Sequence, residues 1–180
     1  MISGPSGAGK GTLVTRVRER RSNLGLTVSA TTRAPRKGEV DGVNYFFLTR
    51  EEFDRRVANG EFVEWAEVHG NCYGTLVSEV TSKLASGSSL ILEIDVQGAL
   101  QVKERFPEAV LIFIKPPSLE VLRERLVGRG TETPEMIELR MANAADELAL
   151  ADRYDDVVVN DDLDRATDEL VRVLDMHERI

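Results

Sequence analysis

A glycine-rich stretch near the start of the chain has the composition and spacing of a phosphate-binding loop. Gly4 is followed by four residues and then by the pair Gly9 and Lys10. The backbone N–H groups of such a loop surround a polyphosphate, and the lysine ammonium reaches its terminal phosphates. Glycines suit the loop because a side chain would block that approach and because several positions require positive φ. Leu13 and Val17 then begin an apolar stripe, which predicts a helix whose N-terminus faces the anion.

The residue after Lys10 departs from the strict motif. A serine or threonine there would supply a hydroxyl ligand to magnesium, but the chain has Gly11 and then Thr12. An ordinary Gly/Ser turn is the alternative interpretation of the stretch. We favour the phosphate-binding loop, because a turn needs neither this many glycines nor a lysine at the mouth of a helix. Before the loop there is only Met1–Ser3, where a typical strand has about five or six residues, so either this strand is short or upstream residues are missing.

Two arginines three positions apart, Arg33 and Arg36, lie in a segment punctuated by proline and glycine. Arginine matches phosphate oxygens through a planar, bidentate fork. On one braced loop the two guanidinium groups can converge on a single anion. Two exposed loop arginines with no ligand are the alternative interpretation.

Over residues 61–68, successive side chains alternate between two faces, which predicts a strand. One face of this strand is apolar except for a single charged residue. Glu64 is the sole charge on that face, and its neighbours there are apolar: Phe62, Ala66 and Val68. Burying a carboxylate without a partner is costly. We therefore expect a fixed donor beside Glu64, which is either a structural arginine or the N–H groups of a ligand.

Strands that alternate with helices indicate an α/β fold with a parallel sheet covered on both faces. Residues 31–83 break that rhythm and predict an inserted, largely antiparallel lobe in which Gly70–Thr75 is a turn. Glu93 and Asp95 end an apolar strand, the position at which an open α/β sheet places its ligand site. The predicted strands are 24–30, 44–48, 61–68, 89–96, 109–115 and 156–160. Thr49 and Glu52 have the spacing of a capping box and predict the start of a helix that runs to about Asn59.

The composition is that of a soluble globular protein, with 180 residues of which 42% are hydrophobic and 30% charged. The net charge of -8 and the pI near 4.9 argue against general binding to nucleic acid or membrane surfaces. No stretch approaches the roughly 20 apolar residues of a membrane span, and no signal-peptide pattern is present. We expect a cytoplasmic protein, and the single cysteine, Cys72, is too few for a disulfide or a structural zinc site.

Six blocks of sequence, taken together, resemble the guanylate kinase family. They stand in the family's order: GPSGAGK at 4–10, SATTRAPRKGEVDGVNY at 29–45, EFVEWAEVHGNCYGT at 61–75, ILEIDVQGA at 91–99, RLVGRGTET at 125–133 and VVND at 158–161. Several of these blocks have no structural reason to occur together in an arbitrary phosphate-loop protein.

This resemblance implies the activity and the organisation of the chain. It implies ATP-dependent phosphorylation of GMP, and also of dGMP, to the diphosphate, with Mg²⁺ as cofactor. It implies a P-loop kinase core with a five-stranded parallel sheet, an inserted mixed or antiparallel GMP-binding lobe and a short helical lid. The implied bounds are 1–30, 84–124 and 145–180 for the core, 31–83 for the lobe and 125–144 for the lid.

The resemblance also implies roles for individual residues. The ATP-binding positions are Gly4, Ser6, Gly7, Ala8, Gly9, Lys10, Gly11, Thr12 and Asn160. The GMP-binding positions are Ser29, Arg33, Arg36, Tyr45, Glu64, Tyr73, Thr75 and Asp95. The positions that act on the transferring phosphate are Lys10, Arg36, Arg125, Arg129 and Arg140. No metal ligand is certain, but Thr12 and, through water, Asp95 are candidates.

Two alternative functions stay open at this point. The first is a guanylate-kinase-like interaction module that has lost catalysis, although such modules typically lose the phosphate loop or its lysine, and Lys10 is retained. The second is a related P-loop kinase that acts on another small phosphate ester. ATP and GMP are the expected partners, and the chain is expected to act as a monomer or homodimer without nucleic acid or membrane.

Overall fold

The computed structural model describes residues 1–85, 87, 89–128, 130 and 133–178. The chain divides into two compact units with their own sheets and helices. The first unit is discontinuous and consists of Met1–Ser22 and Ala109–Ile180, and the second is the continuous segment Asn23–Glu108. The predicted phosphate-binding loop lies in the first unit, and the predicted GMP-binding residues lie in the second.

The first unit contains a three-stranded parallel sheet in the order β1-β8-β9. These strands are β1 (Ile2–Ser3), β8 (Ile112–Lys115) and β9 (Asp156–Val159). Phe113 and Ile114 of the central strand are both fully buried. A parallel strand covered on both faces has no alternation of polar and apolar residues, which explains the hydrophobic run that ends at Ile114; Lys115, the last residue of β8, is exposed.

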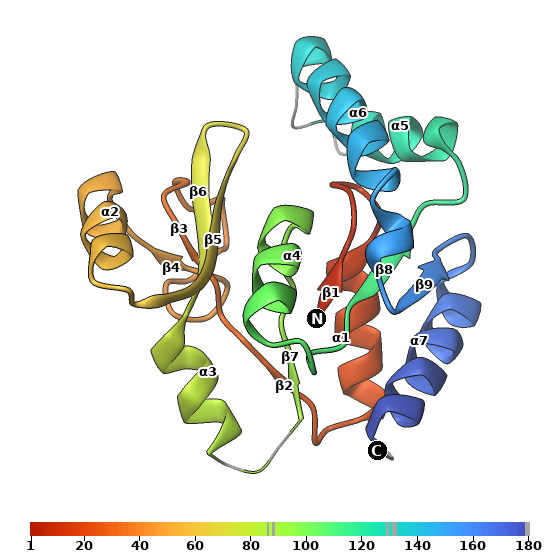
Figure 1. Ribbon diagram of the computed structural model, residues 1–180. Coiled ribbons are helices and arrows are strands. Elements are labelled where there is room, and N and C mark those ends of the chain that lie inside the picture. Colours follow the sequence, from red (N-terminus) through yellow and green to blue (C-terminus); the bar gives the residue numbers. More distant parts are fainter. Residues whose placement is uncertain (86, 88, 129, 131–132, 179–180) are drawn as a thin grey trace. The chain divides into compact units, whose positions relative to one another are not determined.

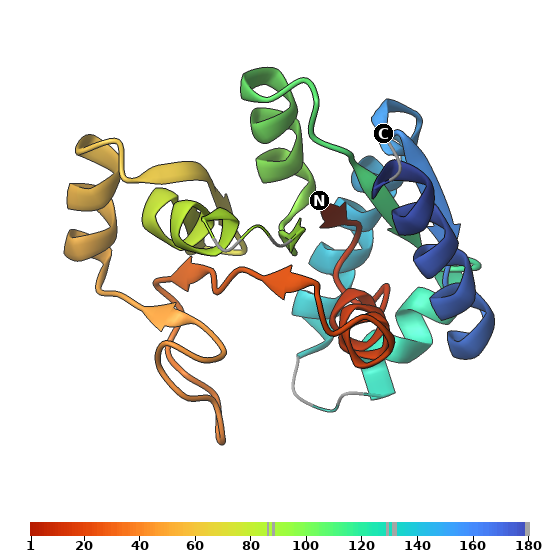
Figure 2. The ribbon, with the colours of Figure 1, turned by 90° about the horizontal axis from the view of Figure 1, so that it is seen from below.

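The helices of the first unit are α1 (Lys10–Arg20), α5 (Leu119–Gly128), α6 (Pro134–Leu148), the short 3₁₀ helix η1 (Ala151–Arg153) and α7 (Leu163–Glu178). Helices α1 and α7 lie beside the parallel sheet (Figure 1, Figure 2). Arginines of α1 pair with carboxylates of α7, as Arg16 does with Asp164 and Arg20 with Asp168. The basic end of α1 is therefore a set of exposed ion pairs, each worth little by itself.

The second unit contains a four-stranded mixed sheet in the order β4-β3-β6-β5. These strands are β3 (Ala30–Thr31), β4 (Phe46–Phe47), β5 (Phe62–Val68) and β6 (Asn71–Leu76). Strand β3 pairs with β4 in parallel, whereas β6 is antiparallel to both of its neighbours, β3 and β5. The strand β5 lies at one edge of this sheet.

The other elements of the second unit are β2 (Gly25–Leu26), α2 (Arg50–Ala58), α3 (Val77–Leu84), β7 (Leu90–Ile91) and α4 (Val96–Arg105). Strands β2 and β7 form a separate parallel pair. The side chain of Thr49 accepts a hydrogen bond from the N–H of Glu52 at 3.1 Å, which confirms the predicted start of α2.

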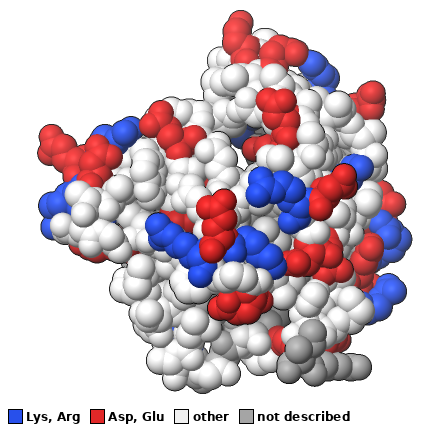
Figure 3. Space-filling model, in the orientation of Figure 1, with Lys and Arg blue, Asp and Glu red and all other residues white. Residues whose placement is uncertain are grey.

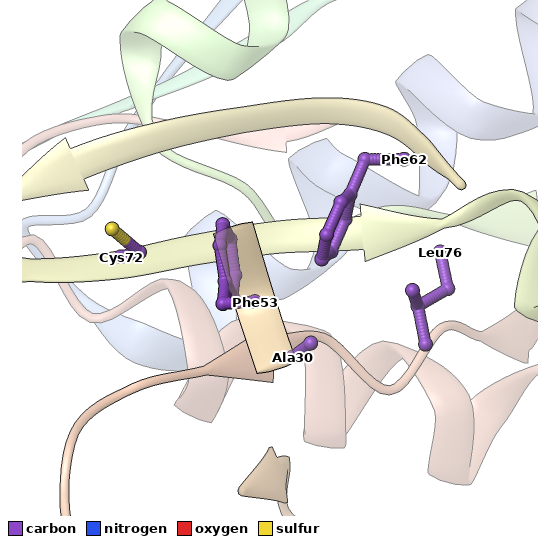
Figure 4. Close-up of a cluster of buried hydrophobic side chains, with 5 residues drawn as sticks. All are labelled: Ala30, Phe53, Phe62, Cys72 and Leu76. Carbon is purple, nitrogen blue, oxygen red and sulfur yellow. The ribbon is translucent and has the colours of Figure 1, made fainter. Parts of the chain in front are cut away.

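A buried apolar cluster joins α2 to the mixed sheet (Figure 4). Phe53 of α2 stacks on Phe62 of β5 with ring centroids 4.5 Å apart. Cys72 is fully buried in the same cluster, which also contains Ala30 and Leu76. The side chain of Cys72 is therefore part of the packing of the second unit.

Two predicted elements are wrong. Residues 24–30 do not form one strand, because β2 pairs with β7 whereas β3 pairs with β6, so the chain passes from one sheet to the other between them. The predicted turn over Gly70–Thr75 is mostly strand β6, and the turn itself is at His69 and Gly70, whose φ angles are 52° and 77°. Hydropathy alone does not reveal which sheet a short strand joins.

The single five-stranded parallel sheet is not confirmed. The described residues have three parallel strands in one unit and a parallel pair in the other. The α/β class itself is confirmed by these strands and by the helices that alternate with them.

Acidic and basic side chains are interspersed on the face of the molecule that Figure 3 shows. Red and blue side chains alternate there and do not segregate into one large field of a single sign. Among the described residues, none of the helices combines the length and the hydropathy that a bilayer crossing requires.

Candidate functional site

The glycine-rich loop connects β1 to α1 and adopts the predicted conformation. Gly4, Gly7 and Gly9 have φ angles of 141°, 92° and 90°. A Cβ atom on Gly4 would lie 2.2 Å from the carbonyl oxygen of Ile114 in β8, which no side chain tolerates. Glycine is therefore required both for the positive φ and for the close approach of the loop to the sheet.

Lys10 is the first residue of α1, and its ammonium is held over the loop. Its Nζ donates to the carbonyl oxygens of Gly4 at 2.6 Å and Pro5 at 3.1 Å. Thr12, in the same first helical turn, is exposed, as is Gly11. A cation and the N-terminus of an eleven-residue helix thus meet at one end of the loop, which favours an anion there.

The carbonyl oxygen of Ala8 is held by two side chains from distant parts of the first unit. Asn160, which is 6% exposed, donates from Nδ2 at 2.8 Å, and Arg125 donates from Nη1 at 3.4 Å. Arg125 also donates from Nη2 to the carbonyl oxygen of Asn160 at 2.8 Å. In a trans peptide the C=O and the following N–H point in opposite directions. Fixing the Ala8 carbonyl therefore also fixes the direction of the Gly9 N–H.

Of the other two arginines predicted to close over the phosphates, the structure describes only one. Arg140 of α6 donates from Nη1 to the hydroxyl oxygen of Ser6 in the loop. Arg129 lies outside the described residues. The structure thus brings Arg125 and Arg140 to the phosphate-binding loop, at Ala8 and Ser6.

In the second unit, a β-bulge at Val63 changes the predicted face of β5. Phe62 pairs with Leu76 and Glu64 with Thr75, so Val63 has no partner in the ladder. An extra residue shifts the alternation by one position, and Phe62 therefore lies on the face opposite Glu64. The prediction that both share a face is wrong for this reason.

The bulge places Glu64 and Thr75 on one face of the β5–β6 hairpin, with Tyr73 next along β6. Glu64 is 2% exposed and Thr75 is fully buried. Burial raises the pKa of Glu64 from 4.5 to about 7, and the negative charge of Asp95 adds to this while Thr75 opposes it. The Thr75 hydroxyl lies close enough to have that effect, yet it makes no hydrogen bond of acceptable geometry. The described residues thus bring together a buried carboxylate and a buried hydroxyl, and the hydroxyl has no hydrogen-bond partner among them.

Asp95 lies beside this pair and caps α4. Its Oδ1 accepts from the N–H groups of Gln97 at 2.8 Å and Gly98 at 3.1 Å. One role of Asp95 is therefore structural, and its second oxygen is not used in the cap. This position beside Glu64 is compatible with the predicted role of Asp95 in binding GMP.

The predicted phosphate clamp forms a connected group of side chains. The rings of Tyr45 and Tyr73 are 6.1 Å apart, and the guanidinium of Arg33 lies over the Tyr45 ring at 5.4 Å. Burial raises the pKa of the Tyr45 hydroxyl, and the charge of Glu93 adds to this effect. Arg33, Tyr45 and Tyr73 are therefore neighbours, as a shared anion would require.

Glu39 belongs to this group and was not predicted. Its oxygens accept from Nη2 of Arg33 at 2.9 and 3.0 Å, and one of them accepts from the backbone N–H of Arg36 at 2.7 Å. The hydrogen bond to Arg33 lowers the pKa of Glu39. Glu39 follows Arg36 by three residues, so its carboxylate can reach the backbone of the same loop. An acidic residue at this spacing in an arginine-rich loop is the signal from which its role could have been predicted.

Arg36 and Ser29 complete the predicted GMP set. The side chain of Arg36 is exposed, and its backbone N–H is fixed by Glu39. Ser29 directly precedes β3, and its carbonyl oxygen accepts from the N–H of Phe46 at 2.9 Å. The two histidines are outside the predicted sets: His69 is in the β5–β6 turn, and His177 of α7 contacts Asp156 at 2.6 Å.

Comparison with known proteins decides the family. A sequence model described as guanylate kinase matches residues 1–177. The chain belongs to the guanylate kinase family. It is 53% identical to a guanylate kinase from Halalkalibacterium halodurans and 56% identical to one from Gloeobacter violaceus. Each alignment covers 97% of this chain and 85% of the relative.

A solved structure supports the same family. The crystal structure of guanylate kinase from Anaplasma phagocytophilum matches with a TM-score of 0.80 and 38% sequence identity, over 97% of this chain and 82% of that one. The α/β P-loop kinase fold predicted from the guanylate kinase resemblance is thereby confirmed.

Proposed function

We propose that this guanylate kinase family member transfers the terminal phosphate of ATP to GMP, forming ADP and GDP, and that it accepts dGMP as well. The observation that carries the choice of GMP is the buried pair of Glu64 and Thr75. Guanine presents an N1–H and an amino group to a carboxylate, and its O6 accepts from a hydroxyl. Adenine lacks the adjacent donor pair, so Glu64 would receive neither of the two hydrogen bonds that guanine supplies.

The donor nucleotide binds at the glycine-rich loop in this proposal. The N–H groups of the loop, the Lys10 ammonium and the N-terminus of α1 receive the phosphates of ATP. Ser6, Thr12 and Asn160 belong to the same site. Because Asn160 donates to the carbonyl of Ala8, its role is to orient the loop in addition to any contact with adenine.

The acceptor phosphate is held by Arg33, Arg36, Tyr45 and Tyr73. Phosphoryl transfer depends on positioning and on neutralising charge more than on proton chemistry. Lys10, Arg125 and Arg140 supply positive charge at the loop, where the transferring phosphate starts its path. Arg129 is assigned the same task from the resemblance.

Magnesium fits this site as a cofactor that the nucleotide itself carries. The described residues contain no cluster of three acidic, histidine or cysteine side chains. Mg²⁺ in kinases is held largely by phosphates and water and by one or two protein groups. At the loop, Thr12 is the residue whose hydroxyl would hold it, and the resemblance assigns Asp95 of the second unit a role through water. When bound, the ion neutralises phosphate charge.

The functional subdivision follows from these roles. We assign the core to 1–30, 84–124 and 145–180, the GMP-binding lobe to 31–83 and the lid to 125–144, and we propose that the core has five parallel strands. A cytoplasmic location, a monomer or homodimer, and the lack of nucleic-acid or membrane partners remain predictions.

A coupled assay of ADP release tests the function directly. Wild-type protein is supplied with ATP, Mg²⁺ and, in separate reactions, GMP, dGMP, AMP or a sugar phosphate. We expect kcat/KM for GMP to exceed that for AMP by about 10⁴-fold, as in sites whose buried polar groups must be paired. Lys10→Ala is the control, with an expected loss of about 10²- to 10³-fold in kcat. Little GMP-dependent ADP release would overturn the proposal and favour the interaction module or another P-loop kinase.

A further inference from the structure

One face of helix α4 is directed at strand β5. Gly98, Gln101 and Arg105 are separated by three and four positions, so they lie on the same side of the helix. Gln101 donates from Nε2 to the carbonyl oxygen of Trp65 at 2.9 Å and accepts from the N–H of Trp65 at 3.4 Å. Arg105 donates from Nη1 to the carbonyl oxygen of Val63 at 2.8 Å.

These hydrogen bonds hold the backbone on both sides of Glu64. Strand β5 is the edge of its sheet, so its outward N–H and C=O groups have no neighbouring strand. The side chains of Gln101 and Arg105 take the place of that strand. One of them binds the bulged residue Val63, whose irregular pairing turns Glu64 toward the face it occupies.

The third position on this face of α4 has no side chain, and Glu64 occupies the space. A Cβ atom on Gly98 would lie 2.3 Å from Oε2 and 3.0 Å from Cδ of Glu64. It would also lie 3.4 Å from Oδ2 of Asp95, which is ordinary contact. The carboxylate in its present position is therefore compatible only with glycine at 98.

Backbone conformation does not explain this glycine. Gly98 is in the first turn of α4 and is not among the glycines with positive φ. A glycine within a helix costs about 0.8–1.0 kcal/mol relative to alanine. Gly98 therefore weakens its own helix without being needed for its φ angle. The reason for glycine here is the space that the Glu64 side chain occupies.

We propose that Gly98 is a positioning residue that sets the specificity for guanine, because it provides the space in which the Glu64 carboxylate is held. Gln101 and Arg105 support it by fixing the strand that carries Glu64. This inference rests on the proposed function, since guanine is the group that Glu64 receives. Gly98 itself need not touch the nucleotide.

The variant Gly98→Ala tests the proposal in steady-state assays with GMP, dGMP and AMP. We expect KM for GMP to rise about 10- to 100-fold, because a displacement of about 1 Å in a binding group can cost that much. KM for ATP should stay at the wild-type value, and the preference for GMP over AMP should fall by the same factor as the GMP affinity. Gln97→Ala, at an exposed neighbour in the same helical turn, should match wild type in every constant.

Thermal unfolding separates positioning from damage to the fold. The atoms that the new methyl group meets belong to the end of the Glu64 side chain, so we expect the unfolding midpoint of Gly98→Ala to equal or exceed that of wild type. A midpoint clearly below wild type, or failure to fold, would show that Gly98 serves packing and would overturn the proposal.

A double-mutant cycle gives an independent result. Glu64→Asp retracts the carboxylate by one methylene and so makes room for a methyl group on residue 98. We expect Glu64→Asp to raise KM for GMP less in the Gly98→Ala background than in wild type. Additive effects, or a Gly98→Ala variant with wild-type GMP kinetics, would defeat this inference while leaving the proposed function intact. A wild-type protein without GMP-dependent activity would defeat the proposed function instead.

Discussion

Replacing Glu64 by Gln should make the protein more stable and at the same time poor at recognising GMP. The native protein holds the Glu64 carboxyl with a pKa near 7 instead of 4.5, because burial disfavours its charged form. Between these two pH values the unfolded chain releases the proton and the native protein keeps it. The native state is therefore progressively destabilised as pH rises from 4.5 to about 7, and the full penalty applies above that range.

The size of this penalty follows from the two pKa values. The rise from 4.5 to about 7 corresponds to roughly 3 kcal/mol of unfolding free energy, at about 1.4 kcal/mol for each pKa unit. Gln has the same shape and no charge, so Glu64→Gln should recover this amount at pH 8 and nothing at pH 4.5. For a chain of this length the gain is about 6–12 °C in unfolding midpoint at pH 8, at about 2–4 °C for each kcal/mol.

Recognition of GMP should change in the opposite direction. Two hydrogen bonds to a charged acceptor contribute about 1.5–3 kcal/mol each. Their loss should lower kcat/KM for GMP by about 10²- to 10⁴-fold, at about 1.4 kcal/mol for each factor of ten. In the wild type, GMP binding requires the carboxylate, so KM for GMP should also rise as pH falls below about 7.

Two assays decide the outcome. Urea unfolding of wild type and Glu64→Gln at pH 5 and pH 8 measures the stability, and coupled kinetics measures the recognition. Equal stability of the two proteins at pH 8 would refute the claim that Glu64 is buried at a cost. Retention of GMP selectivity by Glu64→Gln would refute its role as the group that receives guanine.

Three further substitutions have expected outcomes. Asn160→Ala removes the donor to the Ala8 carbonyl and should raise KM for ATP about tenfold, the equivalent of a hydrogen bond of 1.4 kcal/mol; an unchanged KM for ATP would argue against a role in orienting the loop. Glu39→Gln weakens the hold on Arg33 and should raise KM for GMP several-fold with kcat preserved, whereas a fall in KM would mean that Glu39 competes with the phosphate. Thr49→Ala removes the cap of α2 and should lower the unfolding free energy by about 1 kcal/mol without any kinetic change, as urea unfolding would report.

Local patterns predicted the parts of the site that depend on nearby residues. The spacing of Gly4, Gly9 and Lys10 predicted a glycine loop before a helix, and the positive φ expected at its glycines is confirmed. Thr49 with Glu52 located the start of α2. In each case the physical cause lies within a few residues, so the sequence contains it.

The rest depends on contacts between distant residues. The alternation rule assumes a regular strand, and a bulge at Val63 violates it without any mark in the hydropathy. Glu64 was predicted to be buried with a partner, and it is buried, but the space that receives it comes from Gly98 on another element. The link between Asn160 and Ala8 spans most of the chain, and no local pattern encodes it.

The discontinuity of the first unit has a consequence for synthesis of the protein. Strand β8 pairs Ile112 with Ile2 on one side and with Asp156 on the other, so this sheet closes only after residues 156–159 have left the ribosome. The hydrogen bond from Asn160 to the carbonyl of Ala8 also forms only after that segment has been synthesised. The second unit is continuous in sequence, and domains generally fold as they emerge from the ribosome. During translation the segment that carries Glu64 is therefore expected to fold first, before the unit with the phosphate-binding loop has its last strand.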